Sequence, residues 1–97
     1  MTGPLDGFWE AIDAQLEELR TATSADDVIS ILNRYSPPSS GEASFAGGGG
    51  DERVDDALDR AGWTYIWFDA PYFWAMRAPD GSVITYVEGD IYRGNQR

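Results

Sequence analysis

Residues 62–82 read GWTYIWFDAPYFWAMRAPDGS and hold seven aromatic side chains. From Trp63 the side chains follow the two-residue repeat of a β-strand rather than a helical repeat. Two turn signals interrupt the stretch, one at Ala70-Pro71 and a stronger one at residues 79–81, where Pro-Asp-Gly suits a three-residue hairpin loop. The sequence therefore predicts a three-stranded antiparallel β-meander over residues 63–88.

The two turns also set a strand register. The opposed pairs are Tyr65 with Met76, Trp67 with Trp74, Trp74 with Tyr86 and Met76 with Ile84. One predicted sheet face carries Trp63, Tyr65, Trp67, Trp74, Met76, Ile84 and Tyr86. The opposite face is also mostly apolar, with Ile66, Phe68, Phe73, Ala75, Val83 and Val87. Antiparallel sheets usually turn one polar face to water, so either the helices wrap further than usual or one face is an interface.

Three short helices are expected before this sheet. Residues 6–20 have an apolar stripe at helical spacing, formed by Phe8, Ile12, Leu16 and Leu19. Residues 24–35 begin with a capping-box-like Ser24 and Asp27, so that residues 6–35 form a helical hairpin. Residues 51–61 form the third helix, with Gly62 as its left-handed C′ residue.

The remaining segments are expected to be irregular. Residues 36–50 combine prolines, serines and four consecutive glycines, which predicts a flexible loop with Phe45 as an anchor onto the core. Residues 89–97 follow a turn signal at Gly89-Asp90, and Ile91 and Tyr92 either add a short last strand or pack as a tail. Together these elements predict one α+β domain over residues 1–97.

Composition excludes several kinds of chemistry. The chain has no Cys and no His, and all seven basic residues are Arg, which removes thiolate, imidazole and lysine catalysis together with the commonest metal ligands. The tetraglycine is not followed by the Lys-Ser/Thr of a phosphate loop. We therefore expect no cofactor, no metal and no enzymatic activity.

The net charge of −10 disfavours direct binding to nucleic acid and favours a protein partner with a basic surface. No apolar run is long enough to cross a bilayer, and MTGPLDGFWE lacks the regions of a signal peptide. The expectation is a cytoplasmic protein without membrane contact.

Two surfaces are candidates for function. The aromatic sheet face is either the core beneath the helices or a protein-binding patch, whose residues are Trp63, Tyr65, Trp67, Trp74, Arg77 and Tyr86. The same face, or an edge strand, could instead form a homodimer. The acidic residues are either a solvated surface or a mimic of spaced phosphates that occupies a basic groove, and the candidates are Asp51, Glu52, Asp55, Asp56 and Asp59.

The segment AGWTYIWFDAPYFWAMRAPDGSVITYVEGDIYRG, together with the use of Arg in place of every Lys, resembles the small acidic accessory proteins of phages that infect actinobacteria. The resemblance covers about the last third of the chain and implies a non-enzymatic modulator or inhibitor of a host protein. It identifies no functional residue.

Overall fold

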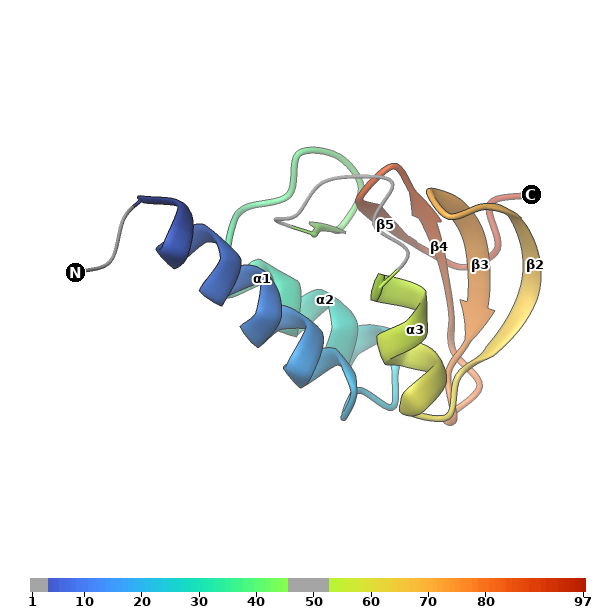
Figure 1. Ribbon diagram of the computed structural model, residues 1–97. Coiled ribbons are helices and arrows are strands. Elements are labelled where there is room, and N and C mark those ends of the chain that lie inside the picture. Colours follow the sequence, from blue (N-terminus) through green and yellow to red (C-terminus); the bar gives the residue numbers. More distant parts are fainter. Residues whose placement is uncertain (1–3, 46–52) are drawn as a thin grey trace.

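The computed structural model describes residues 4–45 and 53–97, with side chains described from residue 10 onward. Three helices form one layer and a five-stranded antiparallel sheet forms the other, so the α+β class is confirmed (Figure 1). The helices are α1 (Pro4–Leu19), α2 (Ala25–Asn33) and α3 (Arg53–Arg60). The strands are β1 (Ala43–Ser44), β2 (Thr64–Ala70), β3 (Phe73–Arg77), β4 (Val83–Val87) and β5 (Asp90–Arg93).

The three-stranded meander is the part of the predicted fold that needs correction, because two further strands extend the sheet. The strand order is β1-β5-β4-β3-β2, with β5 paired to β4 and β1 paired to β5. A two-residue turn at Glu88 and Gly89, both with positive φ, folds β5 back onto β4. Residues 89–97 therefore contain a strand, and residues 36–50, expected to be a loop, contribute β1 at residues 43–44.

The start of α2 and the end of α3 follow their expected local signals. The Ser24 hydroxyl accepts a hydrogen bond from the backbone N–H of Asp27 at 3.0 Å, which caps α2. At the end of α3, Gly62 has a φ of 96°, and the N–H of Trp63 donates to the carbonyl of Leu58 at 3.0 Å. This pattern is a Schellman motif, and it sends the chain directly from α3 into β2.

The core lies between the helical layer and one face of the sheet. Ile12, Leu19, Val28, Leu32, Val54 and Leu58 enter it from the helices, and Trp63, Trp74, Met76, Ile84, Tyr86 and Ile91 enter it from the sheet side. The rings of Trp74 and Tyr86 stack across the β3–β4 pair with centroids 4.7 Å apart and planes 7° apart. Phe45, expected to be an anchor, is also buried. Ordinary packing of large aromatic residues thus accounts for part of the aromatic stretch.

The β3–β4 loop joins the sheet to the α1–α2 connection. The three-residue loop at 79–81 is confirmed by the pairing of Arg77 with Val83 and by a hydrogen bond from the Ala78 N–H to the Ser82 carbonyl at 2.7 Å. The Ser82 hydroxyl accepts from the Ala25 N–H at 2.8 Å. The Trp63 indole N–H donates to the Ala22 carbonyl at 2.8 Å, so two separate bonds hold the layers in one orientation.

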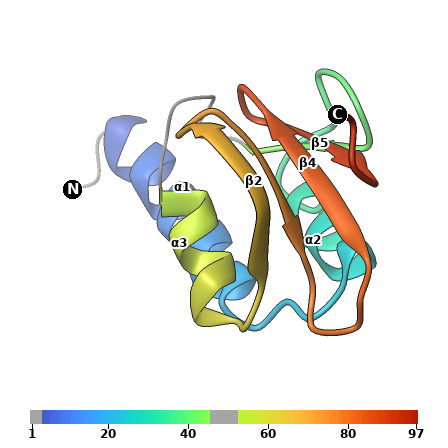
Figure 2. The ribbon, with the colours of Figure 1, turned by 90° about the vertical axis from the view of Figure 1, so that its right-hand side faces the viewer.

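The opposite face of the sheet is not covered by any of the described helices (Figure 2). Within residues 4–45 and 53–97, no helix combines the length and the apolar character needed to cross a membrane.

The pairing of β1 with β5 can be tested at Gly41, which has a φ of 68°. A Cβ added there would lie 2.4 Å from the Ile91 carbonyl oxygen, and this oxygen already accepts a hydrogen bond from the Glu42 N–H at 2.8 Å. Gly81 is a matched control, because its φ is 93° and nothing lies within 4 Å of the added Cβ. We expect Gly81→Ala to lower the free energy of unfolding by about 1–2 kcal/mol, the cost of a left-handed alanine.

Gly41→Ala should cost at least about 1 kcal/mol more than this control, because the β5 backbone must also move. Chemical denaturation of both variants measures the difference. Equal losses would show that the close approach of residue 41 to β5 is absent.

Candidate functional site

Three of the six aromatic-patch residues belong to the core. Trp63, Trp74 and Tyr86 are 1%, 0% and 0% exposed, so they form no part of the molecular surface. They face the helices, and this settles which sheet face is covered. The predicted patch is therefore corrected at these three positions, since a side chain without exposed area cannot contact a partner.

A β-bulge in β2 explains why the other aromatic residues do not share one face. Tyr65 pairs with Met76 as predicted, but Trp67 pairs with Ala75, and Phe68 takes the predicted place of Trp67 opposite Trp74. The extra residue between Tyr65 and Trp67 shifts the register and reverses the directions of Trp67 and Phe68, and a second register shift follows between Phe68 and Ala70. The turn is also displaced, since Ala70 pairs with Phe73 and leaves residues 71–72 between the strands.

Trp67 consequently lies on the outer face of the sheet, where residues 94–97 cross it. Its indole N–H donates to the Asn95 side-chain oxygen at 2.8 Å, and its ring meets Phe73 edge to face with centroids 4.7 Å apart. The Arg97 guanidinium carbon lies 4.4 Å from the centroid of the Trp67 ring, and the same guanidinium forms an ion pair with Asp69. This segment covers part of the face that the helices leave open.

The cover over Trp67 predicts a spectroscopic response. In Asn95→Ala/Arg97→Ala the indole loses its hydrogen-bond acceptor and the overlying guanidinium, so we expect the tryptophan emission to shift to longer wavelength. The same double substitution in a Trp67→Phe background should leave the emission of the other tryptophans unchanged. An identical spectrum for the variant and the original chain would show that residues 94–97 do not cover Trp67 in solution.

Arg77 lies apart from the remaining aromatic residues. It is exposed at the end of β3, and its guanidinium donates to the Gly81 carbonyl of the β3–β4 loop at 3.2 Å. Its position on the outer face, at the hairpin end, separates it from Tyr65, which faces the helical side.

Three of the four exposed aromatic residues in the part of the chain whose side chains are described lie around β2, a strand at the edge of the sheet, and the fourth, Tyr35, follows α2. Tyr65, Phe68 and Tyr72 are 46%, 48% and 47% exposed. The rings of Tyr65 and Phe68 meet edge to face with centroids 5.5 Å apart. Phe68 and Tyr72 were not among the predicted site residues, because an unbroken alternation places Phe68 on the other face and because Tyr72 belongs to the displaced turn.

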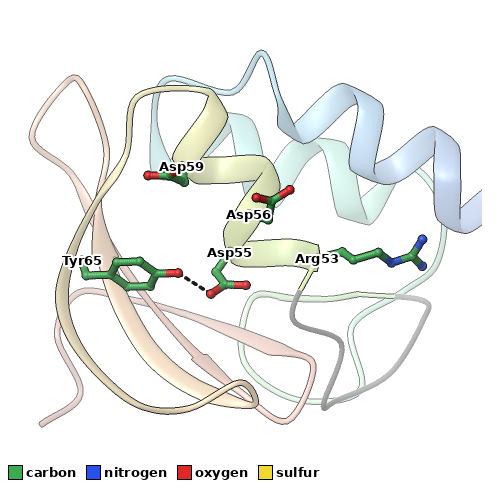
Figure 3. Close-up of a pocket in the computed structure, with 5 residues that line it drawn as sticks. All are labelled: Arg53, Asp55, Asp56, Asp59 and Tyr65. Atoms are coloured by element: carbon green, nitrogen blue, oxygen red, sulfur yellow. Dashed lines mark hydrogen bonds between the residues drawn. The ribbon is translucent and has the colours of Figure 1, made fainter.

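The acidic candidates lie beside this aromatic edge. Asp55, Asp56 and Asp59 of α3, with Arg53 and Tyr65, line a hollow of about 430 Å³ (Figure 3). Asp51 and Glu52, the other two acidic candidates, lie outside the described residues. The structure thus brings one predicted aromatic residue and three predicted acidic residues, separated in the sequence, into one site.

Tyr65 and Asp55 connect the two sides of the hollow. Tyr65 reaches from β2 to α3, and its hydroxyl donates a hydrogen bond to Asp55 Oδ2 (Figure 3). Burial, this hydrogen bond and the nearby carboxylates raise the pKa of Tyr65 above its ordinary value. The phenol therefore remains protonated at neutral pH, and it acts as a hydrogen-bond donor there rather than as a general base.

The other groups in the hollow have different surroundings. Asp55 is only 6% exposed, and its Oδ1 is buried without a hydrogen-bond partner among the described residues. Asp56 accepts from Arg60 at 3.0 Å, and Asp59 is exposed. Arg53 extends away from Tyr65 and forms an ion pair with Asp13 of α1 at 3.6 Å (Figure 3). In the described ranges, no three acidic side chains are arranged to hold a metal ion.

The Tyr65–Asp55 contact can be tested by its contribution to stability. Tyr65→Phe removes the one side-chain donor to the Asp55 carboxylate among the described residues, and hydrogen bonds to charged groups contribute about 1.5–3 kcal/mol. We expect a loss of this size in the free energy of unfolding, measured by urea denaturation. Tyr72→Phe is the matched control, with an expected change below about 0.5 kcal/mol at an exposed position. Equal midpoints for the two variants would contradict the contact.

Comparison of the chain with protein-family models, with curated proteins and with solved structures finds no match in any of the three.

Proposed function

We propose that this chain is a non-enzymatic protein-binding module that modulates a host protein, and that it binds through a composite surface at β2 and α3. The composite surface consists of Tyr65, Phe68, Tyr72, Asp55, Asp56 and Asp59. The observation that carries the proposal is the adjacency of exposed aromatic rings and an acidic hollow, joined by the hydrogen bond from Tyr65 to Asp55.

The aromatic part of this surface has the composition of protein interfaces. Tyrosine and phenylalanine are enriched in interface cores, where they provide large contact areas at a low cost in conformational entropy. Phe68 and Tyr72 each expose nearly half of their area, which is available to a partner. The free side of β2 adds unpaired backbone groups beside the rings, a second means of contact for a partner.

The acidic part of the surface favours a partner with basic groups. With seven arginines against seventeen acidic residues, the chain attracts cations at long range, and carboxylates lining a hollow strengthen the attraction locally. Such complementarity raises the association rate, while the aromatic contacts slow dissociation.

The alternative, a nucleic-acid mimic, receives less support from the described residues. A mimic requires exposed carboxylates that replace phosphates. Asp55 is buried and bound by Tyr65, and Asp56 is paired with Arg60, which leaves Asp59 as the exposed acidic residue of α3 without an ion pair among the described residues. The homodimer alternative loses part of its surface, because Trp67 on the outer face is overlaid by residues 94–97.

Site-specific photo-crosslinking tests the composite surface. A benzophenone amino acid placed at Phe68 or Tyr72 should form a covalent adduct with one host protein in a lysate of the cell that makes the chain. The same probe at Tyr35, an exposed tyrosine on the α2 side, is the matched control and should form none. The adducts should persist at 0.5 M NaCl and disappear when Tyr65 is replaced by Ala.

Three results would contradict the proposal. Adducts at Tyr35 alone would place the contact elsewhere. Complete loss of the Phe68 adduct in salt, with competition by DNA, would favour the mimic. Adducts with a second copy of the chain would favour the homodimer.

A further inference from the structure

We infer that the hollow between α3 and β2 is a receptor site for an arginine side chain of the protein partner, an inference that rests on the proposed function. The site consists of Asp55, Asp59, Tyr65 and Phe68. It assigns to the partner one chemical group, a guanidinium, rather than a general basic character.

The first support is an incomplete set of hydrogen bonds at Asp55. One oxygen of this buried carboxylate accepts from Tyr65, but Oδ1 has no partner among the described residues. Buried carboxylate oxygens are normally satisfied, because desolvation without a compensating bond is costly. Asp55 lines the hollow, so an N–H donor that enters there and reaches Oδ1 completes the set.

The second support is the distribution of charge in the hollow. Its lining includes three carboxylates and one cation, and the cation, Arg53, is directed to Asp13 on α1 (Figure 3). Asp56 is engaged by Arg60, whereas Asp59 is exposed on the turn of α3 next to Asp55. Residues four apart on a helix lie on the same side, so one ligand group can reach Asp55 and Asp59 together.

The third support is the aromatic wall of the hollow. Tyr65 closes it on the β2 side, and Phe68 meets Tyr65 edge to face. Both rings are nearly half exposed, which leaves ring surface for a planar cation. A guanidinium stacks on an aromatic face while its N–H groups remain free to bind carboxylates in the plane, and an ammonium group cannot combine these contacts in the same way.

The protein contains an example of the same arrangement on its other face. The Arg97 guanidinium lies over the rings of Trp67 and Phe73, at 4.4 and 5.9 Å from their centroids, and pairs with Asp69. There, two aromatic rings in edge-to-face contact and one carboxylate hold an arginine. The hollow at α3 is lined by the ring of Tyr65 and by carboxylates, and Phe68 lies edge to face against Tyr65 beside it. Among the described residues, Arg53 is the arginine of this lining, and it is directed to Asp13.

Titration of the full chain with short capped peptides, followed by two-dimensional NMR of the backbone amides, tests the inference. An Ac-Gly-Arg-Gly-NH₂ peptide should produce saturable shifts at residues 55, 59 and 65. The citrulline analogue has the same shape without the charge and should produce none. The lysine analogue should bind at least about fivefold more weakly, because it lacks the planar fork.

Variants locate the binding. Asp59→Asn should raise the dissociation constant of the arginine peptide at least about fivefold, and Asp55→Asn should raise it at least about tenfold. Glu10→Gln, which removes one exposed charge outside the hollow, is the matched control and should have no effect. Because Asp55→Asn could alter the fold, the exposed Asp59→Asn serves as the second variant, and the amide spectra report whether each remains folded.

The inference is overturned if citrulline or lysine peptides bind as well as arginine, if Glu10→Gln weakens binding as much as Asp59→Asn, or if free arginine binds more tightly than the capped peptide. The last result would indicate a small-molecule site. Crosslinking at Phe68 without any amide shift on addition of the arginine peptide would refute the receptor site but remain consistent with the proposed binding module. Arginine-dependent shifts without crosslinking would support the receptor site and count against the proposed module.

Discussion

A β-bulge between Tyr65 and Trp67 divides the aromatic side chains of β2 between the two faces of the sheet, and the other surface features depend on this division. The extra residue directs Trp67 to the outer face, where Asn95 and Arg97 bind it. It directs Tyr65 and Phe68 to the helical side. β2 is an edge strand of the sheet. Tyr65 and Phe68 therefore lie at the border of the core, where the neighbouring side chains of α3 at the hollow are carboxylates. Without the bulge, Trp67 would take the place of Phe68 opposite Trp74, and the outer face would lose the ring on which Arg97 lies.

The high aromatic content therefore has three separate physical causes. Trp63, Trp74 and Tyr86 give a short chain the buried area that it needs for a stable core, and the first of them also fixes the α1–α2 connection through its indole N–H. Trp67 and Phe73 form a platform for the segment 94–97. Within residues 62–82, Tyr65, Phe68 and Tyr72 keep large exposed areas, and the rings of Tyr65 and Phe68 are in contact. These are the aromatic residues of the stretch that neither the core nor residues 94–97 cover. They form a small surface, which limits the proposed contact to the β2 edge of the molecule.

Local signals predicted the parts of the fold that depend on a few adjacent residues. The Ser24 cap, the Gly62 helix end and the loop at 79–81 all lie where the sequence indicates them, because each is fixed by hydrogen bonds within a few positions. The β3–β4 register was correct for the same reason. The bulge in β2 was not predictable, since alternation continues through WTYIWF and no Gly or Pro marks the extra residue. The strand β1 was missed because its two residues pair with β5, a pairing between segments that are distant in the sequence. The same limit applies to the candidate site. The sequence identified Tyr65 and the α3 carboxylates separately, but it did not predict their contact, because this contact depends on how the helices pack on the sheet.

The arginines complete the electrostatic argument. Among the described residues, Arg20, Arg34, Arg53, Arg60, Arg93 and Arg97 each form an ion pair with an acidic side chain, and Arg77 binds a backbone carbonyl. Six of the seven arginines are thus ion-paired within the protein, and the exposed Arg77 lies at the β3–β4 hairpin, apart from the hollow. Exposed ion pairs contribute little to stability, so these arginines act mainly by neutralising acidic side chains, including Asp56 at the hollow. Among the carboxylates that line the hollow, Asp55 and Asp59 form no ion pair with the described residues, and the ring of Tyr65 belongs to the same lining. A carboxylate next to an aromatic ring is a much stronger site for a cation than a carboxylate in open water, because the ring excludes solvent and contributes its own attraction.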